Sequence, residues 1–343
     1  MLPNAPNLGV SVCALMLLTF STAFAQEPLA KPGQPGWTRT DTGCFVWNQN
    51  PQADATVSWT GGCKDSRANG QGSLVWHWHW ASLQERYEGD VRDGKPSGQG
   101  KITFSSNDRY EGGWSDGKPN GQGVYSWSNG DRYEGDWLSG RRSGHGTISL
   151  GAGGHYTGEW KDNKANGKGV FVSRTGDRYE GEWLDGKANG HGTFIWANGD
   201  RYEGEWHDDM RLGTGTLMFA NGARYEGQWR DSKANGHGAL IWSFGDRYDG
   251  DWHDDKRTGL GLITYVNGDR YAGEWKDDKR SGYGILARAD GSRYEGSWLD
   301  DKADGPGVYK SPDGTAYSGL WDVGCFKDGN RRAVVGGDPA SCP

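Results

Sequence analysis

The sequence of 343 residues contains 59 Gly and 19 Trp, and aromatic residues make up 13% of it. Its mean hydropathy is −0.86, but this aromatic share is not typical of a disordered chain, and the missing Gly-X-Y triplet excludes collagen. The formal net charge of −7 gives no overall attraction for nucleic acid or anionic lipid. We therefore expect no nucleic-acid partner.

The N-terminal residues 9–25, GVSVCALMLLTFSTAFA, form an uncharged apolar run that ends in Ala23-Phe24-Ala25. This pattern predicts a secretory signal peptide over residues 1–25, although no Lys or Arg precedes the run. An uncleaved membrane anchor is the alternative, but a bilayer span needs about 20 apolar residues. We therefore expect an exported protein, periplasmic or secreted, that begins with a linker over residues 26–43.

Four cysteines lie outside the signal segment, at Cys44, Cys63, Cys325 and Cys342. An even number in an exported chain predicts two disulfides, with three possible pairings. Their positions favour the local bridges Cys44–Cys63 and Cys325–Cys342, each stabilising by roughly 3 kcal/mol in the chain-entropy model. These bridges would hold an N-terminal cap over 44–84, which contains one degenerate repeat, and a C-terminal cap over 322–343.

Between the caps, residues 85–321 contain eleven units with a constant period of 23 residues. Positions are counted here from the Tyr that opens each unit, from Tyr87 to Tyr317. Gly stands at +2 in every unit and at +11 and +13 in the first ten, while Trp stands at +4 in all but the first, which has Val91. Position +15 is large and apolar in the first ten units. Internal repetition at such a period indicates a stacked array of identical structural units.

The spacing within each unit predicts two short β-strands. Tyr, Gly and Trp at 0, +2 and +4 share one face of a strand, while Arg at −1 and Glu at +1 share the other. Six of the ten links between units are Asn-Gly or Asp-Gly, such as Asn198-Gly199, which predicts hairpin turns with positive φ at both residues. The fold class is therefore all-β: an elongated, open antiparallel sheet of stacked 23-residue hairpins with disulfide-pinned caps.

One unit reads Tyr133-Glu134-Gly135-Asp136-Trp137, followed by Gly144-His145-Gly146, and most others match it. This pattern resembles the MORN repeat family, and the combination with a signal segment resembles exported MORN repeat proteins of bacterial type. The resemblance implies β-hairpin repeats in an open, often curved sheet. It also implies a scaffold for protein interaction or oligomerisation, or a membrane-associated, sometimes lipid-binding protein.

Motifs that carry chemistry are missing from the sequence: it contains no phosphate loop, His-Glu-x-x-His, Gly-x-Ser-x-Gly or Cys-x-x-Cys. We expect no enzyme and no cofactor. His77 and His79 would project from one face of a strand and could share a metal, but an aromatic cap strand with outward polar residues is the favoured alternative. The acidic pairs at +6 and +7, such as Asp277-Asp278, are interpreted as turn charges rather than a row of weak cation sites.

Aromatic residues recur at +17 and could line an exposed groove that stacks on sugar rings or holds peptides. Our leading hypothesis is a non-enzymatic exported scaffold for protein–protein interaction or self-association, with an unidentified partner. Cell-wall or glycan binding through the groove is the first alternative, and binding of membrane phospholipid is a less expected second one. The groove candidates are Phe104, Trp127, Trp196, Phe219, Trp242 and Tyr265.

Overall fold

The computed structural model describes residues 36–48, 56–77 and 84–342, and β-strands make up nearly all of their regular structure. The chain divides into two compact units at residues 188 and 189. Among the described residues no helix is both long and apolar enough to cross a bilayer. The prediction of an all-β, open antiparallel sheet of hairpin repeats is confirmed.

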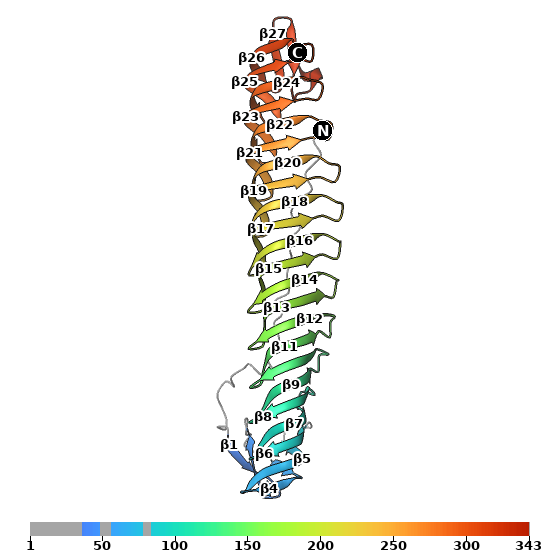
Figure 1. The fold of residues 1–343 in the computed structure, drawn as a ribbon, viewed down its shortest axis with the longest axis vertical. Helices are drawn as coiled ribbons and strands as arrows, with labels where there is room; N and C mark the ends of the chain where they lie inside the picture. Colours follow the sequence, from blue (N-terminus) through green and yellow to red (C-terminus); the bar gives the residue numbers. More distant parts are fainter. Residues whose placement is uncertain (1–35, 49–55, 78–83, 343) are drawn as a thin grey trace. The chain divides into compact units, whose positions relative to one another are not determined.

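In the compact unit that ends at residue 188, the strands from β5 onward pair antiparallel with their neighbours in chain order (Figure 1). Its strands are β1 (Gly36–Arg39), β2 (Phe45–Asn48), β3 (Thr56–Trp59), β4 (Gly62–Lys64), β5 (Arg67–His77), β6 (Glu85–Arg92), β7 (Lys95–Thr103), β8 (Arg109–Ser115), β9 (Lys118–Ser126), β10 (Arg132–Leu138), β11 (Arg141–Ser149), β12 (Gly154–Lys161), β13 (Lys164–Ser173) and β14 (Arg178–Leu184).

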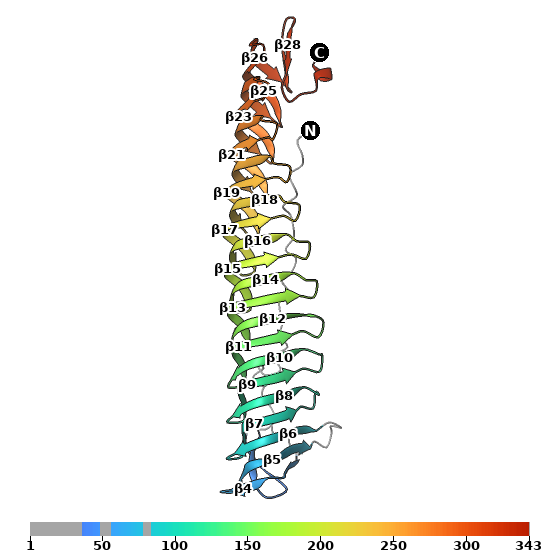
Figure 2. The ribbon, with the colours of Figure 1, turned by 45° about the vertical axis from the view of Figure 1, so that its right-hand side comes forward.

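In the compact unit that begins at residue 189, each strand likewise pairs antiparallel with its neighbours in chain order (Figure 2). The boundary falls within β15 (Lys187–Ile195), and β16 (Arg201–His207), β17 (Met210–Met218), β18 (Arg224–Arg230), β19 (Lys233–Ile241), β20 (Arg247–His253), β21 (Lys256–Thr264), β22 (Arg270–Lys276), β23 (Lys279–Ala287), β24 (Arg293–Leu299), β25 (Lys302–Lys310), β26 (Ala316–Asp322), β27 (Cys325–Asp328), β28 (Arg331–Val334) and the 3₁₀ helix η1 (Pro339–Ser341) follow.

The core of each repeat is a tyrosine ring that lies on glycine backbone. The Tyr156 hydroxyl donates to the carbonyl of Glu159 at 3.0 Å. A methyl group added at Gly169 would lie 2.4 Å from the Tyr156 hydroxyl oxygen, and one at Gly158 would lie 2.5 Å from the Gly169 Cα. The glycines at +2 and +13 are therefore required because the ring and the facing strand occupy the space of a Cβ.

Tryptophan at +4 links each unit to the one before it. The Trp160 indole N–H donates to the carbonyl of Gly146, in the preceding unit, at 3.0 Å. The Trp160 ring also meets the Tyr156 ring edge to face, with centroids 5.2 Å apart, and Tyr156 meets Trp183 of the next unit at 5.1 Å. The Tyr and Trp rings thus form an alternating row, and such edge contacts are worth about 0.5–1.5 kcal/mol each beyond the area that they bury.

A shift of register separates the glycine at +2 from the tryptophan at +4 in the hairpins of the repeats, and in most of them the +3 residue is bulged. Between Gly158 and Trp160 the register of β12 against β13 shifts, and the bulged Glu159 accepts a hydrogen bond from the Lys168 backbone N–H at 3.1 Å. The facing Gly167 has φ of +86° and leaves room for the Glu159 carboxylate. The acidic residue at +3 is therefore a structural clamp as well as a surface charge.

The turns differ from the prediction in one respect. The turns within units have positive φ at both central residues, as at Asp277 (47°) and Asp278 (68°), so these acids are turn residues. The links between units were expected to have the same geometry, and this was wrong: of Asn198 and Gly199 only Gly199 has positive φ. Because the Gly199 N–H donates to the Trp196 carbonyl and the Trp196 N–H to the Asp200 carbonyl, the link is a three-residue loop closed by a glycine bulge.

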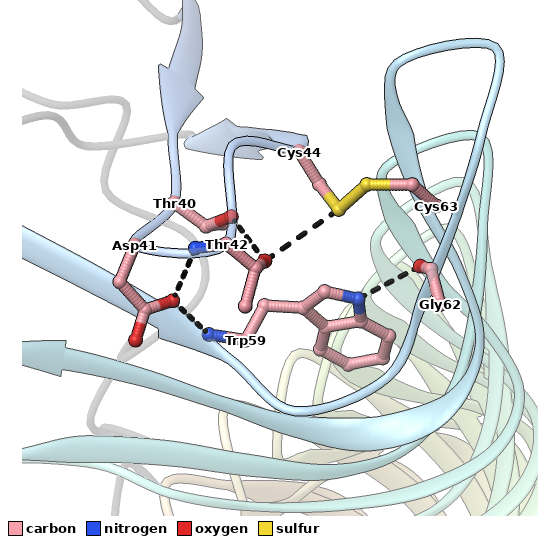
Figure 3. Close-up of a disulfide and its surroundings, with 7 residues drawn as sticks. All are labelled: Thr40, Asp41, Thr42, Cys44, Trp59, Gly62 and Cys63. Carbon is pink, nitrogen blue, oxygen red and sulfur yellow. Dashed lines mark hydrogen bonds between the residues drawn. A yellow bond between two sulfur atoms is a disulfide. The ribbon is translucent and has the colours of Figure 1, made fainter.

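The N-terminal cap covers the outer edge of β5. Strands β3 and β4 both pair with β5, and the Cys44–Cys63 disulfide joins the cap's two segments. The Asp41 carboxylate accepts a hydrogen bond from the Trp59 backbone N–H at 3.0 Å (Figure 3). Strand β1 pairs with β2, so the described end of the predicted 26–43 linker belongs to this sheet rather than to a flexible connection.

The C-terminal cap covers its edge only in part. The Cys325–Cys342 disulfide is formed as predicted, and β27 pairs with β26 at Trp321 and Asp322. In the described chain, residues 316–320 of β26 pair with β25 alone. The sheet edge over these residues therefore has no further strand against it, although the Arg331 side chain donates to the Ala316 carbonyl.

The glycine at +13 offers a direct test of the tyrosine–glycine packing. We expect Gly169→Ala to lower the free energy of unfolding by about 1–3 kcal/mol, because its methyl group collides with the Tyr156 ring. The matched control is Gly186→Asp, at a turn position where other units carry Asp and where an added Cβ meets no atom within 4 Å. Urea denaturation should show the control within about 1 kcal/mol of wild type; an equal loss in both variants would contradict the assignment.

The buried tyrosines also predict a loss of stability at alkaline pH. Burial raises the pKa of Tyr156 above its ordinary value of 10 and that of Tyr294 to about 12. Their contribution is present in full below pH 10 and is lost as the pH rises through the folded-state pKa, since the unfolded chain loses these protons first. Tyrosine absorbance and circular dichroism should therefore change together above pH 10. Complete ionisation near pH 10 with intact dichroism would be the contrary result.

Candidate functional site

The aromatic side chains at +17 lie against arginines from the next unit. The Arg142 guanidinium carbon is 5.8 Å from the Trp127 ring centroid, and Arg211 lies 5.9 Å from that of Trp196. Arg257 lies 5.8 Å from the Trp242 ring. These arginines occupy position +9 and are buried, with Arg257 only 5% exposed. The rings at +17 are therefore part of a packed layer.

The sequence itself records this pairing. In every unit where +17 is Trp or Tyr, the next unit has Arg at +9; where +17 is another residue, the next unit has Ala or Pro there, apart from Phe326 in the C-terminal cap. The first group comprises Trp127–Arg142, Trp196–Arg211, Trp242–Arg257 and Tyr265–Arg280, and the second Phe104–Pro119, Leu150–Ala165, Ser173–Ala188, Phe219–Ala234 and Arg288–Ala303. The two positions vary together, and our prediction from the sequence missed this signal because it treated each position alone.

Each buried arginine is held by the turn of the next unit. The Arg257 Nε donates to Asp278 Oδ1 at 3.0 Å and its Nη2 to the Asp278 carbonyl at 2.8 Å. The guanidinium also lies 4.3 Å from the Trp275 ring centroid. Asp278 stands at +7, so one member of the acidic pair compensates a buried cation. This pairing explains the acid at +7 for Asp278 and Asp301, and the turn geometry accounts for an acid there in all four pairs, without a metal ion.

The predicted aromatic groove is therefore only partly open. Trp242 is 5% exposed, whereas Phe104, Trp127, Trp196, Phe219 and Tyr265 are partly buried. In the part of the chain that the structure describes, the indole N–H groups of Trp127 and Trp242 and the Tyr265 hydroxyl are buried without a hydrogen-bond partner. Burial raises the pKa of Tyr265 to about 12, and Arg280 acts against that rise. A sugar ring could not stack on Trp242 unless its neighbours moved.

The proposed histidine pair cannot be assembled from the described residues. His79 lies outside them, and His77 Nε2 lies 3.4 Å from the Ser58 hydroxyl. No group of three or more His, Cys, Asp or Glu side chains that could hold a metal occurs among residues 36–48, 56–77 and 84–342.

The outer face of the sheet, opposite the Tyr and Trp row, carries the charged residues. Arg at −1 and the acid at +1 form ion pairs along one strand, such as Arg201–Glu203 at 2.6 Å. A shallow hollow opens over the small Ala239, where His237 Nε2 lies 3.1 Å from an Asp249 oxygen. Both signs of charge line this hollow, so it favours no single class of charged ligand.

From β21 onward, apolar residues on the outer face stand at +12 and +14, whereas in four earlier units they stand at +16, as at Met218. Leu260 and Tyr283 stand at +12, and Leu262, Ile285 and Val308 stand at +14. In the earlier units +12 is polar or charged, and +14 is Lys, Thr, Val or Ala. This surface was not predicted from the sequence, because the positions that stay constant between units do not reveal it.

The fold and the repeat geometry together define a β-hairpin repeat protein whose period is set by Tyr, Gly and Trp. A model of the MORN repeat matches ten segments, and the chain belongs to the MORN repeat family. The eleventh predicted unit, from Tyr317, is outside the match; it has Asp328 and Asn330 at the +11 and +13 glycine positions. The matched residues are 87–109, 110–132, 133–154, 156–178, 179–201, 202–224, 225–247, 248–270, 271–293 and 294–316.

Solved structures show likeness at low identity, and no curated protein matches the chain. The TCP10 domain of Danio rerio CPAP in complex with a peptide of Danio rerio STIL is 12% identical, with 63% of this chain and 94% of that chain covered and a TM-score of 0.36. The Drosophila melanogaster SAS-4 TCP domain with a proline-rich motif of Ana2 is 13% identical, with 61% and 98% covered and a TM-score of 0.28. A streptogramin B lyase is 12% identical, with 78% and 88% covered and a TM-score of 0.14.

The coupling between +17 and +9 can be measured by a double-mutant cycle. We expect Arg257→Ala to lower the free energy of unfolding by about 3 kcal/mol, since it leaves the Asp278 carboxylate without its cation. Adding Trp242→Phe recreates the combination Phe219, Ala234 and Asp255 found one unit earlier.

The double variant should therefore lose at least about 0.5 kcal/mol less than the sum of the two single variants. Urea unfolding of the four proteins measures this difference. Additive losses would contradict a direct coupling between the ring and the guanidinium.

Proposed function

We propose that this protein is a non-enzymatic, exported repeat scaffold that binds another protein. One observation carries the proposal: the side chains that recur in most units are used in contacts that hold the fold together. Tyr156 packs on glycine, Trp160 bonds to the preceding unit, and Glu159 clamps the bulge. Residues free to meet a partner are those that vary between units on the outer face.

Export is supported by the cysteine usage. The Cys44–Cys63 and Cys325–Cys342 bridges tie short loops in the two caps, and structural disulfides persist in oxidising compartments. The predicted signal peptide over residues 1–25 lies outside the described residues. Together with the bridges, it favours the periplasm or the extracellular space and an exported MORN protein of bacterial type.

Protein binding is favoured over the two alternatives by the character of the surfaces. Glycan binding needs exposed aromatic faces, and the candidate ring of Trp242 is buried against Arg257. Phospholipid binding needs a basic surface, whereas the outer face alternates Arg201–Glu203-type ion pairs and the chain has a net charge of −7.

The proposal is tested by affinity capture with tagged residues 26–343 from envelope and secreted fractions. We expect a protein that co-purifies saturably and that binds the purified chain in calorimetry. Mass spectrometry of the native protein in the same fractions should find Gln26 at its N-terminus. The matched control is a Gly169→Ala/Gly238→Ala variant with disrupted packing. Recovery of the native protein only from the cytoplasm, no direct partner, or a reproducible hydrolase or transferase activity would overturn the proposal.

A further inference from the structure

An exposed apolar surface covers the outer face of β21 to β26, and the inference drawn from it rests on the proposed function and deepens it. Leu260 is 66% exposed and Leu320 75% exposed, and Tyr283 and Val308 are also exposed. We call this surface the apolar outer patch. It consists of Leu260, Leu262, Ala272, Tyr283, Ile285, Val308 and Leu320.

The strand register makes the patch continuous from β21 to β23, and Glu295 on β24 separates Ile285 from Val308. Leu262 pairs with Ala272, and Ala272 pairs with Ile285 on the next strand. Val308 stands in the same row, opposite Glu295. Because neighbouring strands lie about 4.8 Å apart, Leu262 and Ile285 are separated by about 10 Å across the sheet. The patch therefore presents a row of apolar side chains across the strands, at a spacing that one polypeptide segment can follow.

The fold does not need apolar residues at these positions. Position +12, which carries Leu260 and Tyr283 in the patch, is polar or charged in all seven earlier units: Gln99, Gln122, His145, Lys168, His191, Thr214 and His237. Since the Tyr and Trp row is the same in both parts of the array, the core does not explain the change. A contiguous exposed apolar surface indicates an interaction site.

The patch also contains positive charge that the chain does not compensate. In the preceding unit Arg247 pairs with Asp249 at 2.6 Å, and in the next Arg293 pairs with Glu295 at 2.5 Å. Between them, Arg270 has Ala272 at +1 in place of the acid, and among the described residues no ion pair involves Arg270. A carboxylate from a partner could occupy the place of the missing side chain.

We propose that the apolar outer patch binds a polypeptide segment of a partner protein that combines apolar side chains with acidic ones. The apolar side chains cover Leu262 and Ile285, and an acidic one pairs with Arg270. If two copies of this chain paired face to face, the Arg270 guanidinium of each copy would meet the same positively charged surface on the other. An anionic bilayer would meet the Glu274 and Glu295 carboxylates as well as Arg270, which disfavours a lipid surface.

The test uses a displayed library of random 16-residue peptides, selected against the folded protein and then measured by fluorescence anisotropy with labelled synthetic copies. We expect the selected peptides to be enriched in large apolar residues together with Asp or Glu. No enrichment above an unrelated β-protein, or peptides without acidic residues, would overturn the proposal.

Three variants make the result specific to the patch. Leu260→His/Tyr283→Gln/Ile285→Thr introduces residues that other units carry at the same positions, and it should weaken peptide binding at least tenfold. Arg270→Glu should weaken acidic peptides and, in a repeated selection, enrich Lys and Arg instead. Val124→Thr, at +14 outside the patch, is the matched control and should bind as wild type. Equal affinity for all variants would contradict the assignment.

The same variants separate this inference from the proposed function. If a captured protein binds the patch variants as well as it binds wild type, the scaffold function stands and the patch assignment fails. If phosphatidylserine vesicles bind wild type and lose binding in the patch variants, while peptides do not bind, the occupant is a membrane. Concentration-dependent dimerisation of wild type that is lost in the patch variants would identify a second copy as the occupant. Either result overturns the proposal.

Discussion

The tyrosine ring lying on a glycine pair is the contact on which the rest of this structure depends. The Tyr156 ring leaves no space for a Cβ at Gly169, and the close approach of the facing strand leaves none at Gly158. These glycines weaken a strand on their own, because Gly loses more backbone entropy than any other residue. The aromatic ring recovers that loss by covering the bare backbone. Because one hairpin is marginal in water, the Trp183 ring of the next unit must complete the packing around Tyr156.

The contacts between positions +17 and +9 form a second layer of packing, and its residues vary more than those of the Tyr, Gly and Trp layer. The tyrosine, the glycines and the tryptophan hardly vary, whereas positions +9 and +17 vary as a pair. A Trp at +17, such as Trp242, comes with a buried Arg257 in the next unit, while Phe219 comes with Ala234. A guanidinium fills the space beside a ring and needs an acceptor from the turn at +7, here Asp278. The space between +17 and +9 is thus filled either by an aromatic ring with a buried arginine or by a pair without arginine. Both combinations keep the period of 23 residues.

Much of the fold could be predicted from the sequence because its strongest constraints recur at fixed spacing. The strands, the role of glycine and the local disulfides such as Cys44–Cys63 follow from the period and from chain order. The link at Asn198-Gly199 was predicted wrongly, because the dipeptide alone does not show how many residues the loop contains. The clamp at Glu159 could not be foreseen, since it depends on a bulge that the alternation of faces does not reveal. The partnership of Trp242 and Arg257 was missed because it joins different positions of neighbouring units.

The side chains on the outer face of the sheet can vary without disturbing the core. A side chain at +12 or +14 points away from the Tyr and Trp row, so a substitution such as His for Leu at 260 leaves the core contacts intact. Only the backbone N–H at +12 is constrained, by the clamp at +3, and Leu260 donates to Asp251 as its counterparts do in other units. Surface chemistry can therefore change from unit to unit at little cost in stability. A contiguous run of Leu260, Leu262 and Ile285 beside an uncompensated Arg270 is not required by folding. It is better explained by selection for contact with another molecule, since exposed apolar surface otherwise favours aggregation.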